Sequence, residues 1–153
     1  SKSYIKTVPQ NKVVKYHIGN QKDYKLGKHS YAVRMVAEGR SQMRDNALEA
    51  ARQFLTKALD EQALGQYYLA VKVFPHHLLR ENKTAAGAGA DRMSSGMTHS
   101  YGIVIGRAAI VKPGQTVFFI SCANDKVARI ARDSLSAVKS KMPCKVSIVF
   151  EKL

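Results

Sequence analysis

The sequence has few of the residues that mark a secreted, membrane-spanning or disulfide-rich protein. It holds two cysteines in 153 residues, and Cys122 and Cys144 do not form a C-x-x-C pair. We interpret both as small apolar residues in a reducing compartment, with a single disulfide between them as the alternative. No apolar run approaches the roughly 18 residues that a membrane-spanning helix needs. The first ten residues hold no apolar signal core, so we expect a cytoplasmic protein.

Metal-binding and catalytic patterns are also absent. His76 and His77 are adjacent, so on a strand they point to opposite faces, and no cysteine–histidine spacing of the zinc type occurs. The sequence has no G-x-S-x-G nucleophile turn and no paired carboxylates for acid–base chemistry. We therefore predict no metal, no cofactor and no enzymatic activity. A small nuclease is the competing enzyme hypothesis, which cleavage of labelled RNA with magnesium would test.

Acidic residues are scarce relative to basic ones. The chain has 25 lysines and arginines against 11 aspartates and glutamates, which gives a net charge of +14. A compact domain with this charge repels itself, and a polyanionic partner offsets that repulsion most simply. We expect nucleic acid as the partner. An anionic membrane surface is the second candidate, although the densest basic segment lacks the periodicity of an amphipathic helix.

The basic residues are concentrated in residues 1–34. This segment carries eight lysines and arginines against the single acid Asp23, and tyrosines are interleaved with them. The absence of a helical apolar stripe predicts an extended arm or an edge strand along a phosphate backbone; a solvated terminus is the alternative. The expected RNA-contacting lysines here are Lys6, Lys12, Lys15, Lys22, Lys25 and Lys28. Tyr4, Tyr16 and Tyr24 are candidates for stacking on bases, although at least one of them fits the core better.

Hydrophobic periodicity predicts an α+β fold, a mostly antiparallel sheet with two amphipathic helices packed on it, in one domain spanning residues 1–153. The first helix begins at Asp45 as N-cap and ends at Gly65, and the second runs over 125–141 with Asn124 as N-cap. The expected strands cover 13–18, 30–36, 67–74, 101–111, 116–122 and 144–150, with residues 76–80 extended after Pro75.

Residues 83–100 form a glycine-rich loop without periodicity of either kind. The loop lacks the Gly-Lys-Ser/Thr ending of a Walker motif, and Arg92 stands where a dinucleotide loop needs its third glycine. Its small residues let the backbone approach RNA closely, while Lys83 and Arg92 supply phosphate-directed charge. We expect insertion between RNA strands; a disordered surface loop is the alternative. Arg80 joins this set, and Arg40, Arg44 and Arg52 near the first helix are secondary candidates.

Several motifs occur in a family-specific order. They are Tyr4-Ile-Lys, Val8-Pro9, Gly19-Asn20, Asn46-Ala-Leu-Glu-Ala-Ala-Arg52, Phe74-Pro-His-His-Leu-Leu-Arg-Glu-Asn82, Gly87-Ala-Gly-Ala-Asp-Arg-Met93 and Gly96-Met97. Over essentially its whole length the chain resembles the large-subunit ribosomal protein family called L10e in archaea and eukaryotes, the counterpart of bacterial L16. The resemblance implies an α+β sandwich with a hammerhead-like strand arrangement.

The resemblance also implies a function. A member of this family is a structural constituent of the large ribosomal subunit and binds large-subunit rRNA near the aminoacyl-tRNA site and the peptidyl-transferase centre. It supports tRNA positioning and late subunit assembly. The implied partners are large-subunit rRNA, the 5S rRNA region, aminoacyl-tRNA and neighbouring ribosomal proteins, and the residues implied to face tRNA are Gly87, Ala88, Gly89, Ala90, Asp91, Arg92 and Met93. The alternative is a generic basic RNA-binding protein or an assembly factor outside the mature ribosome.

Overall fold

The computed structural model describes residues 9–81 and 103–153. Its strands are β1 (His17–Gly19), β2 (Tyr31–Ala37), β3 (Ser41–Arg44), β4 (Tyr67–Val71), β5 (His77–Glu81), β6 (Ile103–Val111), β7 (Thr116–Cys122) and β8 (Val146–Lys152). Its helices are α1 (Gln21–Lys25), α2 (Asp45–Ala63), α4 (Asp125–Val138) and a 3-10 turn at Lys139–Lys141. The predicted α+β class is confirmed.

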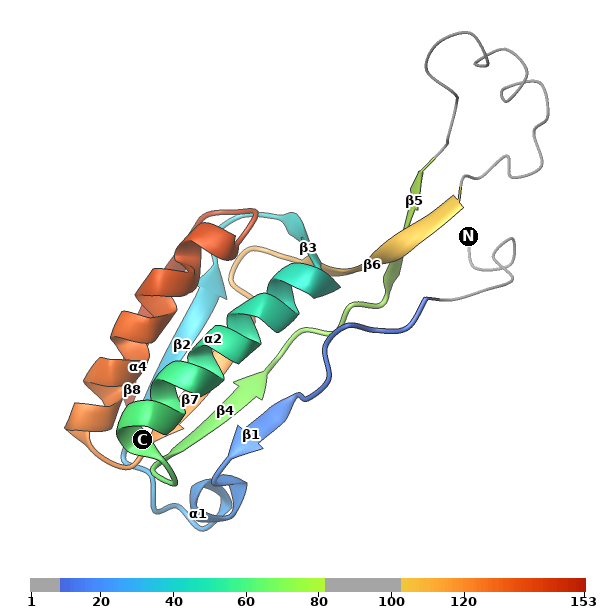
Figure 1. Cartoon of the computed structure of the whole chain (residues 1–153). Coiled ribbons are helices and arrows are strands. Elements are labelled where there is room, and N and C mark those ends of the chain that lie inside the picture. The colour runs from blue at the N-terminus through green and yellow to red at the C-terminus, as the bar shows by residue number, and fades with distance from the viewer. Residues whose placement is uncertain (1–8, 82–102) are drawn as a thin grey trace, which may run out of the picture.

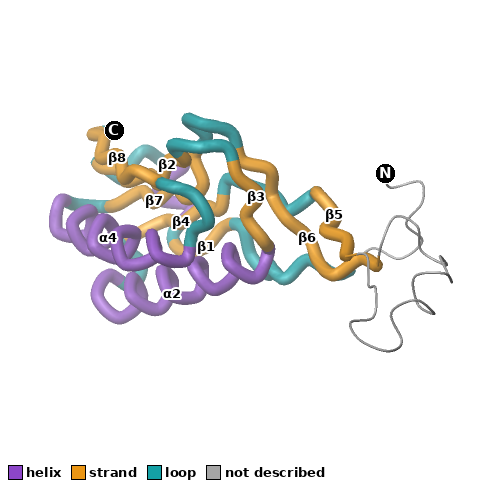
Figure 2. Tube along the Cα trace, turned by 90° about the horizontal axis from the view of Figure 1, so that it is seen from above, coloured by secondary structure: helices purple, strands orange, loops and turns teal. Residues whose placement is uncertain are grey.

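The larger sheet has five strands in the order β1-β4-β7-β2-β8, and every neighbouring pair in it is antiparallel. Helices α2 and α4 lie side by side across one face of this sheet (Figure 1). Figure 2 shows the same two layers from above, with both helices on one side of the strands. The expected arrangement of two helices packed on an antiparallel sheet is therefore present.

The main core fills the space between the two helices and the five-stranded sheet. Leu48, Leu55 and Leu59 recur at helical spacing in α2 and are fully buried. They meet strand side chains that alternate toward the same layer, such as Leu69 and Ile120. The three- and four-residue apolar spacing of α2 thus gives one face of the helix to the core.

A smaller apolar cluster lies on the opposite face of the sheet. Tyr68 and Phe119 alternate with core residues of β4 and β7, so their side chains point away from the helices. Tyr24 of α1 packs on both rings, with centroid distances of 5.0 Å to Tyr68 and 5.5 Å to Phe119. This cluster attaches α1 to the sheet.

Strands β3, β6 and β5 form a second antiparallel sheet in that order. β5 and β6 extend away from the helices and the larger sheet, as both views show (Figures 1 and 2). We call this pair the β5–β6 arm. Residues 82–102, which connect the outer ends of the two strands, lie outside the described residues.

The structure corrects several expected boundaries. Asp45 is not the N-cap of α2: Arg44 holds that position, and Asp45 is the first helical residue, buried at 2% exposure. The expected strand over 13–18 is limited to β1, an edge strand of the larger sheet, because the backbone N–H groups of Lys12 and Val14 donate to the side chains of Asp45 and Glu49 on α2. Helix α4 ends at Val138, where a 3-10 turn continues the chain. Neither α1 nor β3 was predicted.

Candidate nucleic-acid interface

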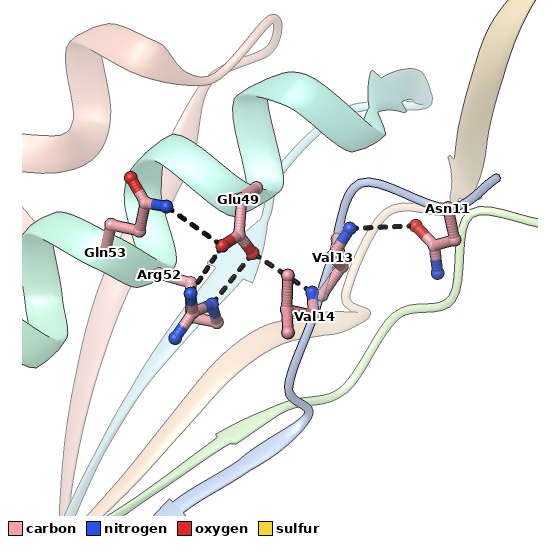
Figure 3. Close-up of polar contacts among 6 residues, drawn as sticks. All are labelled: Asn11, Val13, Val14, Glu49, Arg52 and Gln53. Atoms are coloured by element: carbon pink, nitrogen blue, oxygen red, sulfur yellow. Dashed lines mark hydrogen bonds and ion pairs between the residues drawn. The ribbon is translucent and has the colours of Figure 1, made fainter.

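The basic N-terminal segment is fixed to the start of α2 by two carboxylates. The backbone N–H of Lys12 donates to Asp45 Oδ2 at 3.2 Å. The backbone N–H of Val14 donates to Glu49 Oε2 at 3.3 Å (Figure 3). Val13 between them is buried in the core. Since the helix holds the backbone, the exposed side chains of Lys12 and Lys15 project from a defined position.

Glu49 is also the centre of a side-chain clamp on α2. It accepts hydrogen bonds from Arg52, with Nε at 2.8 Å, and from Gln53 Nε2 at 3.1 Å (Figure 3). The Arg52 hydrogen bond lowers the pKa of Glu49, and the same contact raises the pKa of Arg52. The Arg52 side chain, predicted to contact RNA, is only 11% exposed. Its charge is compensated inside the fold, so the structure places it in the clamp.

Helix α1 presents a second group of lysines. Asn20 caps this helix, its Oδ1 accepting from the N–H of Asp23 at 3.1 Å. Tyr24 anchors the helix to the sheet, while Lys22 and Lys25 are exposed. Lys28 lies 3.9 Å from Asp23, with 64% of its side chain exposed. Three lysines therefore lie on a short helix and the turn after it, and one tyrosine anchors this helix to the sheet.

A group of rings and one guanidinium lies at the base of the β5–β6 arm. Phe74 is 53% exposed, and its ring lies 5.6 Å from that of Tyr16. The guanidinium carbon of Arg107, on β6, lies 5.3 Å from the Phe74 centroid. Neither Phe74 nor Arg107 was predicted as a site residue. Phe74 begins the Phe-Pro-His-His motif, a signal that could have drawn attention to it.

The remaining predicted arginines lie near the arm and the start of α2. Arg40 lies between β2 and β3, Arg44 is the N-cap of α2, and Arg80 is on β5; all three are exposed. Helix α4 adds a basic surface that the sequence analysis did not select. Its Arg129 and Arg132 line a hollow of about 190 Å³ with Asp125, Ala128 and Phe150. The basic residues on the polar face of this helix are the sequence signal that could have indicated this surface.

Five carboxylates of the described residues form ion pairs within the fold. The ion pairs are Asp23–Lys28, Glu151–Arg34, Glu49–Arg52, Asp125–Arg129 and Glu38–Lys145. Within the described ranges, Lys12, Lys15, Lys22 and Lys25 have no carboxylate at ion-pair distance. The surface therefore presents uncompensated cations, which is the electrostatic character of a polyanion-binding surface.

The part of the chain that the structure describes contains no cluster of three or more potential metal ligands. None of its helices combines the length and the apolar character needed to cross a bilayer.

Comparisons with known proteins place the chain in a family. The family model described as ribosomal protein L16p/L10e matches residues 1–149. The chain belongs to this family. It is 41% identical to the large ribosomal subunit protein uL16 of Staphylothermus marinus and 43% identical to that of Methanococcus aeolicus, in each case over 99% of this chain and 85% of the relative. The uL16 of Pyrobaculum calidifontis is 38% identical over 97% of this chain and 83% of its own length.

Membership of the L16p/L10e family confirms the resemblance inferred from the motifs. It also confirms that the chain is not an enzyme, because the matched family and its members are ribosomal proteins. The individual contact residues stay predictions. Those outside the described residues are Lys6, Lys83, Arg92 and the loop residues Gly87, Ala88, Gly89, Ala90, Asp91 and Met93. Tyr4, a stacking candidate, also lies outside them; Tyr24 is part of the sheet-face cluster.

Proposed function

We propose that this chain is a structural constituent of the large ribosomal subunit, in the cytoplasm, and binds large-subunit rRNA. The L16p/L10e match over residues 1–149 supports the assignment to the subunit. The observation that carries RNA binding is the separation of charges on the surface. Five carboxylates of the described residues form ion pairs within the fold, whereas Lys12, Lys15, Lys22 and Lys25 have no carboxylate at ion-pair distance among these residues.

Affinity in this proposal comes from contacts between cations and phosphates. Each neutralised phosphate releases condensed counterions, so binding weakens steeply as salt is added. With about 6–10 such contacts, affinity falls by on the order of 10³–10⁵ between about 50 and 200 mM salt, by analogy with duplex DNA. The major groove of A-form RNA is too narrow to be read, so shape, 2′-hydroxyls and unpaired bases select the binding site.

The proposed phosphate contacts come from exposed residues on several parts of the fold. The N-terminal segment contributes Lys12 and Lys15, and α1 with the turn after it contributes Lys22, Lys25 and Lys28. Arg40 lies between β2 and β3, Arg44 is the N-cap of α2, and Arg80 is on β5. Lys6, Lys83 and Arg92 join them from the sequence alone. Arg52 enters the proposal indirectly, because its contact with Glu49 helps to fix the segment that carries Lys12 and Lys15.

A finer proposal concerns the location within the subunit. We place the chain near the aminoacyl-tRNA site and the peptidyl-transferase centre, with neighbouring ribosomal proteins and the 5S rRNA region as further partners. The β5–β6 arm supports this, since β5 ends and β6 begins at a point away from the packed helices and the larger sheet. Residues 87–93 then contact aminoacyl-tRNA and support its positioning and late subunit assembly. Deleting residues 85–95 tests this: we expect folding to be kept and tRNA accommodation to be impaired.

Co-sedimentation tests the main proposal. A tagged full-length chain, expressed in an archaeal host, should migrate with large subunits in a sucrose gradient and be released by high salt. A Lys12→Gln, Lys15→Gln, Lys22→Gln variant should be released at lower salt. Lys57→Gln removes one exposed lysine on α2, outside the proposed contacts, and should behave as the parent, whereas Lys15→Gln alone should already be released at lower salt.

The alternative is a basic RNA-binding protein or an assembly factor outside the mature ribosome. Such a protein would occur in free fractions or only with immature large subunits, and this distribution would contradict the proposal.

A further inference from the structure

We propose that Phe74 and Arg107 form a stacking platform for one unpaired RNA base at the base of the β5–β6 arm. The inference rests on the proposed function, because it requires that the chain binds RNA. It adds a base contact to the phosphate contacts and assigns it to residues that the sequence analysis did not select.

The Phe74 ring is exposed and yet held in position. It is 53% accessible, although burial of a phenylalanine side chain is normally favourable by about 1.5–3 kcal/mol. The rings of Tyr16 and His76 flank it at centroid distances of 5.6 Å and 6.4 Å. Pro75, which follows Phe74, is buried and restricts the backbone there. A fixed ring loses little conformational freedom when a flat ligand stacks on it.

Arg107 is equally well positioned. Its Nε donates to the carbonyl oxygen of Pro75 at 2.8 Å, which holds the guanidinium over one face of the Phe74 ring. Among the described residues, no acceptor is hydrogen-bonded to either Nη atom of Arg107. These donors are therefore available to the phosphate or the edge of a nucleotide whose base lies against Phe74.

The charges around this platform favour RNA over an apolar protein segment. Lys12 and Lys15 are exposed on the segment that leads into Tyr16. The carboxylates facing Tyr16 belong to Asp45 and Glu49, and both are engaged. Asp45 accepts from the N–H of Lys12, and Glu49 accepts from Arg52 and Val14. An aromatic ring with a guanidinium in a cationic surround is the composition of single-strand RNA sites.

Two RNA probes separate base stacking from phosphate binding. The first is a twelve-nucleotide oligoadenylate with a 5′-fluorescein, and the second is the same chain with abasic ribose at every position. Fluorescence anisotropy gives the affinity of the full-length chain for each probe over a range of salt concentrations. The parent should bind the oligoadenylate more tightly than the abasic chain.

Phe74→Ala should weaken oligoadenylate binding by at least about fivefold and leave abasic binding unchanged, because base–aromatic stacking contributes of that order per base. Its salt dependence should equal that of the parent. Phe74→Tyr should restore binding. Phe54→Ala, a change of a 41% exposed phenylalanine on α2, is the matched control and should have no effect. Arg107→Lys should keep the salt dependence and lose part of the preference for bases.

If Phe74→Ala loses equal affinity for both probes, or loses affinity for neither, the stacking platform is overturned. The platform is also overturned if Phe74→Ala keeps its RNA affinity but loses binding to a ribosomal protein. That result would assign Phe74 and Arg107 to a protein contact. A shift in the thermal midpoint of Phe74→Ala with equal loss on both probes assigns Phe74 a structural role. The proposed function itself fails if the parent binds neither RNA in dilute salt, or if the chain does not migrate with large subunits.

Discussion

Gly19 lies directly against the backbone of Tyr67. A Cβ atom at Gly19 would be 2.5 Å from the carbonyl oxygen of Tyr67, and the glycine has φ of +92°. The next residue, Asn20, donates its N–H to that same oxygen at 2.7 Å. This contact joins β1 to β4 and sets the start of α1. It therefore determines where Lys22 and Lys25 project.

Gly19→Ala should destabilise the fold by about 1–3 kcal/mol, because the substitution adds both backbone strain and a clash with Tyr67. Denaturant unfolding measures the change. Gly27→Ala is the matched control: Gly27 also has a positive φ, +74°, but a Cβ there meets nothing within 4 Å. If the two variants lose equal stability, the contact with Tyr67 has no effect of its own.

Substitution of Arg52 should lower stability without changing the salt dependence of RNA binding, and substitution of Lys15 should do the reverse. Arg52→Ala leaves Glu49 largely buried without its main partner, so the free energy of unfolding should fall by about 1–3 kcal/mol. The salt slope of rRNA binding should not change. Lys15→Gln should keep stability and reduce that slope by about 0.7–0.9, one phosphate contact. A reduced slope for Arg52→Ala at unchanged stability would instead make Arg52 an RNA contact.

The elements predicted from the sequence are those whose signal is local. Leu48, Leu55 and Leu59 have the spacing of a buried helical face, and α2 has that face. Asn124 was expected to cap the second helix, and its Oδ1 accepts from the N–H of Val127 at 3.0 Å. In these cases neighbouring residues alone decide the structure.

The features that were missed depend on contacts between distant residues. β3 has the sequence Ser-Gln-Met-Arg, which is no strand pattern, and becomes a strand by pairing with β6. Helix α1 has five residues, and Tyr24 stabilises it through Tyr68 and Phe119. Phe74 and Arg107 are 33 positions apart in the chain and meet only when β6 passes the β4–β5 connection. The periodicity of neighbouring residues in the sequence does not predict contacts of this kind.

The two cysteines should differ sharply in reactivity. Both are free thiols; Cys122 is fully buried, and burial raises the pKa of its thiol to about 12, whereas Cys144 is partly exposed. Since the thiolate is the reactive form, Ellman's reagent should titrate one thiol per native chain and two after unfolding. Cys144→Ser should abolish the native reaction. No reactive thiol in unfolded, unreduced protein would indicate the disulfide that was the alternative from the sequence.

His29 should make the fold sensitive to acid. It is 4% exposed, its Nδ1 lies 2.6 Å from Ser121 Oγ, and its buried Nε2 has no hydrogen-bond partner in the described residues. Burial lowers the pKa of His29 below its ordinary 6.5, with the Asp23 carboxylate acting in the opposite direction.

The unfolded chain therefore binds a proton at His29 at a pH where the folded chain does not. Linkage then requires that this contribution to stability is complete above about pH 6.5 and is lost progressively as the pH falls below it. Urea unfolding at pH 7.5, 6.5 and 5.5 should show a decrease that His29→Asn reduces, because asparagine does not titrate. His77→Asn, a change of an exposed histidine on β5, should retain the decrease of the parent. An unchanged pH dependence in His29→Asn would show that another group causes the acid sensitivity.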